Sequence, residues 1–74
     1  MSKTKSLIVR NRLRQLLIKK KISGYRLHID TGLTKTTIYD LSNNPHRLPS
    51  SSTLSILMIY FGVSASEIIE LVEE

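Results

Sequence analysis

The sequence predicts a single all-α domain, residues 1–74, built from five short helices, with residues 1–5 expected to be disordered. Its apolar residues recur mostly three or four positions apart, which is the spacing of one helix face. Serines and threonines that can cap a helix start, and glycines that can end one, divide the chain into short segments. No segment alternates apolar and polar residues convincingly enough to predict a strand.

The first three helices follow from these signals. The first is predicted at about residues 6–20, with an apolar face that begins at Val9. Ser23 is a plausible N-cap for the second, and Gly32 can take the left-handed conformation that ends it after residues 25–31. Thr34 caps the third helix, whose inward positions are Ile38 and Leu41. Two helices joined by so short a turn form a helix-turn-helix.

The second half of the chain is predicted to hold a loop and two further helices. Two prolines oppose helix geometry in Asn43–Pro49, so this stretch is predicted to be a loop. Ser50 can cap the fourth helix, which Gly62 ends. Ser64 and Glu67 have the spacing of a capping box and predict a fifth helix. That helix carries the apolar residues Ile68, Ile69, Leu71 and Val72.

The charges are unevenly distributed. The formal net charge is +5, and four of the six acids lie at the end of the chain, at Glu67, Glu70, Glu73 and Glu74. All eleven Lys and Arg lie before Glu67, together with only Asp30 and Asp40. This imbalance is typical of a protein whose partner is a polyanion.

Several other functional classes are disfavoured. With no cysteine and only His28 and His46, we expect no metal site, no disulfide and no cofactor. The Ser50–Ser52 run has no neighbouring general base, so we expect no enzyme. No long apolar run predicts a membrane span, and the beginning of the chain lacks the features of a secretory signal. We therefore expect a cytoplasmic protein, in a bacterial cell or a phage-infected host, that does not bind membranes.

A family resemblance covers roughly Val9 to Ile69. The stretch SGYRLHIDTGLTKTTIYDL, residues 23–41, resembles the helix-turn-helix of the Cro and lambda-repressor type, the XRE family. Residues 49–54 and 57–69 resemble the last two helices of that family. The resemblance implies a lambda-repressor-like fold in which helices 2 and 3 form the DNA-binding unit. It also implies a sequence-specific transcriptional regulator of double-stranded DNA, a phage or Cro-like repressor that acts by occupying its operator.

The same resemblance implies the site residues. The third helix of the family enters the major groove, and its base-reading positions map here onto Lys35, Thr36, Tyr39 and Asp40. Lysine can donate to guanine, whereas an aspartate near phosphates either accepts from cytosine N4 or only penalises wrong sequences. We expect Asp40 to face the groove edge without a firm contact. Phosphate-binding positions are Thr34, Thr37, Asn43, His46, Arg47 and Arg26.

Two residues depart from the family pattern. Gly24 stands where relatives usually carry a glutamine that contacts phosphate, so that contact is expected to be missing or to be replaced by Arg26 or Tyr25. His28 stands at a usual alanine position and is expected to crowd the approach to the third helix. We interpret His28 as a packed or partly exposed neutral side chain rather than a switch.

The chain also carries more apolar residues than one small core can hold. We expect these to form a homodimer interface that binds a pseudo-palindromic operator, made of Ile56, Ile59, Tyr60, Ile69 and Val72. The alternative is an antirepressor or antitoxin-like protein that uses the same fold and patch mainly to bind a protein partner. Strongly salt-dependent DNA binding would separate the two.

Overall fold

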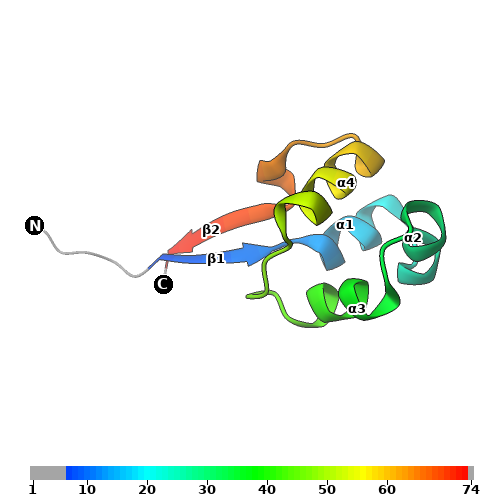
Figure 1. Cartoon of the computed structure of the whole chain (residues 1–74). Coiled ribbons are helices and arrows are strands. Elements are labelled where there is room, and N and C mark those ends of the chain that lie inside the picture. The colour runs from blue at the N-terminus through cyan, green and yellow to red at the C-terminus, as the bar shows by residue number, and fades with distance from the viewer. Residues whose placement is uncertain (1–6, 74) are drawn as a thin grey trace, which may run out of the picture.

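The structure is a computed structural model that describes residues 7–73 (Figure 1). The prediction of disorder for residues 1–5 falls on residues outside this described range. The described chain is mostly helical, with four helices, one 3-10 turn and one two-stranded sheet. In chain order these elements are β1 (Leu7–Asn11), α1 (Leu13–Lys20), α2 (Gly24–Thr31), α3 (Lys35–Asn43), α4 (Ser51–Phe61), the 3-10 turn η1 (Ala65–Glu67) and β2 (Ile69–Glu73).

The all-α prediction is wrong at both ends of the chain. The first helix begins at Leu13, not near residue 6, because residues 7–11 form β1. The predicted fifth helix is only the turn η1 followed by β2, and the Ser64 side chain makes no capping hydrogen bond. Both strand segments are rich in β-branched residues, which pack well on a pleated sheet. Their pairing joins residues about sixty positions apart, so the apolar period within either segment could not reveal it.

The two strands are antiparallel, and the sheet that they form projects from the helices in Figure 1, with β1 running toward the helices and β2 away from them. Val9 faces Leu71 across the ladder and Arg10 faces Glu70. The Arg10 guanidinium donates to the Glu70 carboxylate at 2.8 Å, a cross-strand ion pair that helps fix the register. Val9, predicted to face inward from a helix, is instead exposed on β1, and Leu71 is 63% exposed.

The core lies among the four helices and η1. Its buried residues are Leu13 and Leu16 of α1, Leu27 of α2, Ile38 and Leu41 of α3, Leu57 and Phe61 of α4, and Ile68. Each helix therefore contributes at least one side chain to a single cluster. Because side chains of both α2 and α3 pack in this cluster, the packing fixes the orientation of the two helices relative to each other.

Asn11 is the one buried polar side chain of the described core, at 5% exposure. Its amide nitrogen donates to the backbone carbonyls of Leu41 (3.0 Å), Asn44 (3.2 Å) and Arg47 (2.6 Å). Its side-chain oxygen accepts from the Leu13 N–H at 3.0 Å, and its own N–H donates to the Pro45 carbonyl at 2.7 Å. The end of α3 and the loop after it are thereby fastened to the junction of β1 and α1.

A second polar cluster joins α2 to α4 at the surface. The Tyr60 hydroxyl donates to the Asp30 carboxylate at 2.6 Å, and Arg26 Nε donates to the same oxygen at 2.9 Å. The hydrogen bond from Tyr60, and then that from Arg26, lowers the pKa of Asp30. The hydrogen bond to Asp30 in turn raises the pKa of Tyr60. Tyr60 also packs against the core and against the edge of the Phe61 ring.

These pKa shifts predict a loss of stability at both pH extremes. The lowered pKa of Asp30 stabilises the fold above the ordinary aspartate pKa, and this contribution is lost as pH falls through the lowered value. The raised pKa of Tyr60 stabilises it below the ordinary tyrosine pKa, and this contribution is lost as pH rises through the raised value. The variant Tyr60→Phe keeps the ring, removes the effect at Tyr60 and weakens the effect at Asp30, which keeps its hydrogen bond from Arg26. Urea unfolding of Tyr60→Phe should therefore vary less with pH than wild type in the acidic and alkaline ranges, and equal pH profiles would contradict the expectation.

Candidate nucleic-acid interface

Helices α2 and α3 begin after the N-caps that the sequence predicts and α2 ends at the predicted glycine, whereas α3 includes Asn43, the first residue of the predicted loop. The Ser23 hydroxyl accepts from the Arg26 N–H at 3.0 Å, and the Thr34 hydroxyl accepts from the Thr37 N–H at 3.1 Å. Gly32 ends α2 with φ +80, a left-handed conformation that a side chain would strain. The predicted helix-turn-helix is confirmed, with residues 32–34 as the turn.

The turn itself is fixed by side chains of α2. His28 Nδ1 is within hydrogen-bonding distance of the Leu33 carbonyl, which makes Nδ1 the protonated nitrogen because a carbonyl only accepts. The Thr31 hydroxyl accepts from the Leu33 N–H at 3.2 Å and donates to the Leu27 carbonyl at 2.6 Å. His28 is half-buried, as expected, but it also holds the turn, a role that sequence reasoning missed.

Gly24 allows α3 to approach the start of α2 closely. A Cβ at this position would lie 3.2 Å from Tyr39 Cε1 and 3.3 Å from Ile38 Cγ2, tighter than most real contacts. The Tyr39 ring therefore occupies space that the usual glutamine of the family would need. This close approach gives a physical reason for the departure at Gly24, and Tyr39 remains 48% exposed beside it.

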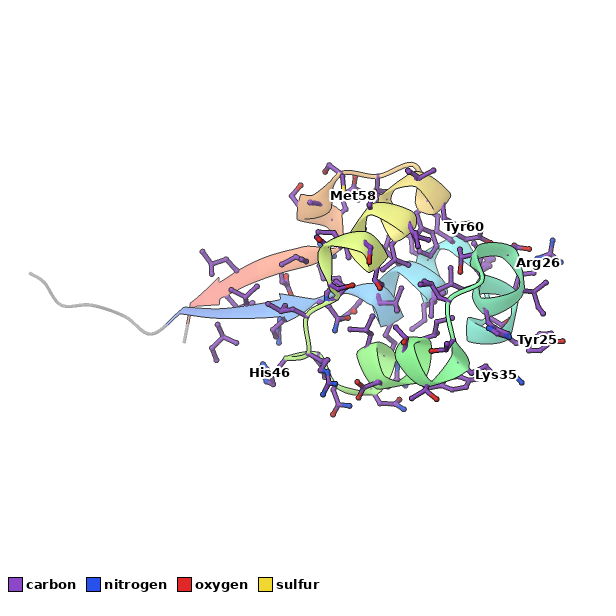
Figure 2. All side chains as sticks on the ribbon, in the orientation of Figure 1. Tyr25, Arg26, Lys35, His46, Met58 and Tyr60 are labelled. Atoms are coloured by element: carbon purple, nitrogen blue, oxygen red, sulfur yellow. The ribbon has the colours of Figure 1, made fainter. Side chains whose placement is uncertain are left out.

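The outward face of α3 carries most of the predicted base-reading residues. Ile38 and Leu41 are buried, as predicted, whereas Lys35, Thr36 and Tyr39 are exposed. Figure 2 shows Lys35 next to Tyr25 of α2, and the Lys35 ammonium lies 5.3 Å from the centre of the Tyr25 ring. That distance is typical of a cation–π contact, so this lysine is partly ordered before any ligand binds.

Asp40, the fourth predicted base reader, is engaged by its neighbours. One carboxylate oxygen lies 3.1 Å from Arg47 Nε, and the other accepts from the Asn44 side-chain amide at 2.9 Å. The expectation that this acid makes no firm contact with DNA stays a prediction, but within the free protein both of its oxygens are engaged. Arg47 carries the opposing charge and comes from the loop, so the structure joins two residues that the sequence assigned to different roles.

The predicted phosphate-binding residues fall into two groups. Around α3, the Thr34 hydroxyl donates to Thr37 Oγ1 at 2.9 Å, so the Thr37 hydroxyl hydrogen remains to donate outward. Asn43 and His46 are exposed at the far end of α3, and Figure 2 shows His46 well separated from Lys35. Arg26 differs, because it is bound to Asp30 on the side of α2 that faces Tyr60.

Metal and membrane sites were also considered for the described part of the chain. Residues 7–73 bring together no group of three His, Cys, Asp or Glu side chains that could hold a metal ion. Within the same range, every helix is too short or too polar to cross a membrane. The exposed polar residues of α3 and of the loop after it form the candidate site.

Comparisons with known proteins identify the family and the fold. A family model described as a Cro/C1-type HTH DNA-binding domain matches residues 12–74. A Bacteroides fragilis protein assigned provisionally as DNA-binding has a similar structure, with a TM-score of 0.74 at 22% identity over 85% of this chain and 100% of its own. The transcriptional regulator VanUg is similar at a TM-score of 0.71 and 23% identity, over 100% of this chain and 97% of its own. None of the curated proteins compared with the chain matches its sequence.

Proposed function

We propose, because the chain belongs to the family of Cro/C1-type HTH DNA-binding domains, that it regulates transcription by binding a specific double-stranded operator. The family is one of DNA-binding regulators and not of enzymes. The observation that carries the proposal is the exposed polar face of α3, held by the packed turn of residues 32–34. In this proposal the protein is a repressor of the phage or Cro-like type, which blocks transcription by occupying its site.

Helix α3 is proposed to lie in the major groove, with its first turn against the base edges. Lys35 can donate to guanine O6 and N7, and its contact with Tyr25 limits the freedom it loses on binding. Thr36 can hydrogen-bond a base or place its methyl group against thymine. Tyr39 is long enough to reach a base or a phosphate. Because Gly24 has no side chain, the Tyr39 ring can pack against the start of α2.

Phosphate contacts are proposed on both sides of this reading face. Thr37 and the backbone N–H groups capped by Thr34 offer donors at the start of α3, where the helix dipole favours an anion. Asn43 and His46 offer donors at its end, and Arg26 can reach an outer phosphate with the guanidinium edge that Asp30 does not use. Such contacts fix the register of the protein on DNA without selecting its sequence.

A two-fold dimer is proposed to place two α3 helices in successive major grooves. Of the five apolar residues assigned to its interface, Ile59 is the most available, at 80% exposure, while Ile56 and Val72 are half-buried. Tyr60 and Ile69 pack against the core of their own chain, which reduces what they can offer a partner. A dimer predicts that the operator contains two inverted half-sites about 10 base pairs apart.

The salt dependence of binding tests this function against the protein-partner alternative. We expect affinity for duplex DNA to fall steeply with salt, because each phosphate contact by a basic group releases condensed counterions. The measurement is the slope of log affinity against log salt, which should correspond to several phosphate contacts. A flat slope, or no DNA binding at low salt, would contradict the proposal and favour an antirepressor or antitoxin-like role that uses the exposed apolar residues.

A further inference from the structure

Arg47 has a fixed backbone position relative to α3. Its N–H donates to the Asn44 carbonyl at 2.9 Å, which closes a turn directly after the helix. Its carbonyl accepts from the buried Asn11 amide at 2.6 Å, and Asn11 also binds the carbonyl of Leu41 within α3. These hydrogen bonds hold the backbone of the loop at Arg47 against the end of α3.

The Arg47 side chain is also oriented. Its Nε lies 3.1 Å from one oxygen of Asp40, and the other oxygen of Asp40 is held by the Asn44 amide at 2.9 Å. Asp40 follows Thr36 by four residues, which places both on the outward face of α3. The guanidinium thus lies along the face that the proposed function assigns to the major groove. It remains open to ligand, since the Arg47 side chain is 65% exposed.

This arrangement suits a base better than a phosphate. A phosphate contact needs only positive charge, and a neighbouring carboxylate would weaken it by offsetting that charge and repelling the anion. A guanine contact needs the planar fork in a defined orientation, because two N–H groups must meet O6 and N7 together. A carboxylate that orients the guanidinium before binding reduces the side-chain entropy lost when DNA binds. An exposed arginine without such a partner would lose more side-chain entropy on binding.

We propose that Arg47 reads a guanine in the major groove and that Asp40 is the positioning residue that orients its guanidinium. This inference rests on the proposed DNA-binding function and changes the roles expected from the sequence, where Arg47 was to bind phosphate and Asp40 to read a base. Asp40 then acts on specificity through Arg47 and contributes little attraction of its own.

The test is selection of bound sites from a random duplex pool by wild type and by variants confirmed as folded by circular dichroism. Arg47→Ala should lose the preference for one guanine per half-site by about 10-fold or more. Arg47→Lys should lose part of it, because a lysine can donate to guanine but lacks the planar guanidinium that Asp40 orients. Arg47→Lys should nevertheless keep the salt slope, because it keeps the charge. Asp40→Asn should weaken the same preference without lowering affinity for random DNA, since it removes a negative charge near phosphates. Replacing that guanine with 7-deazaguanine should weaken wild type but not Arg47→Ala.

Arg26→Ala is the matched control. Like Arg47, Arg26 is exposed and paired with an aspartate, here Asp30, but it lies on α2 and not beside the outward face of α3. It should weaken binding to all sequences alike and only slightly, since Asp30 offsets part of the charge of Arg26. If Arg47→Ala behaves as this control does, the base-reading assignment is overturned. If Arg47→Ala loses the guanine preference but Asp40→Asn keeps it in full, the positioning role of Asp40 is overturned. A wild type that selects no sequence would instead overturn the proposed function itself.

Discussion

Asn11→Ala should lower the free energy of unfolding by about 3 kcal/mol, a large fraction of the stability of a domain this size. The variant removes a buried amide that donates to three backbone carbonyls, among them those of Leu41 and Arg47, and an oxygen that accepts from the Leu13 N–H. Each buried polar group left without a partner costs about 1–3 kcal/mol, and alanine also leaves a cavity. Urea unfolding followed by circular dichroism measures the loss.

Asn43→Ala is the matched control for this experiment. Asn43 is the same residue type on α3 but is exposed, so its replacement should change stability by less than about 0.5 kcal/mol. Equal unfolding midpoints for Asn11→Ala and Asn43→Ala would show that the network around Asn11 does not hold the loop to the core.

The local signals in the sequence are sufficient for the three helices that matter most to function. Ser23, Thr34 and Ser50 each cap a helix with the predicted hydrogen bond, and Gly32 and Gly62 each end one with a positive φ. These interactions join residues three or four positions apart, so they can be predicted without knowledge of the rest of the chain. The resemblance to the family predicts that the recognition face lies on α3, and this assignment stays a prediction.

Apart from the contact of His28 with the nearby Leu33 carbonyl, the features that the sequence did not predict depend on side chains from other segments of the chain. Asn11 lies in a segment that reads as an amphipathic helix, but its pairing with β2 puts it next to the end of α3. The ion pair of Asp40 with Arg47 depends on a loop whose path no local pattern defines. The sequence predicts Tyr60 in a dimer interface because nothing in it indicates the hydrogen bond to Asp30, which lies thirty positions away. In each case the signal was a polar residue whose partner could not be identified from spacing.

Replacing Lys35 or Thr36 with alanine should reduce discrimination between the operator and random DNA by about 1–3 kcal/mol if either residue reads a base. Both side chains are exposed on the first turn of α3, so neither replacement removes a core contact. Affinity for random DNA should fall much less, because that binding depends on phosphate contacts that remain. Binding titrations on the selected operator and on a random duplex give both quantities.

Two controls make the result interpretable. Circular dichroism must show that both variants keep the helical content and unfolding midpoint of wild type. Asn43→Ala should weaken binding to the operator and to random DNA alike, because Asn43 is proposed to bind phosphate. A variant of the buried residues Ile38 or Leu41 would be uninformative, since it would unfold α3 and abolish all binding together.

Whether the exposed first turn of α3 reads DNA sequence is decided by the ratio of operator affinity to random-duplex affinity for Lys35→Ala and Thr36→Ala, measured at one fixed salt concentration. We expect this ratio to fall about 10-fold or more in at least one of the two folded variants, while random binding stays close to wild type. Folded variants that both keep the wild-type ratio would contradict the claim, because the sequence would then be read by another part of the protein.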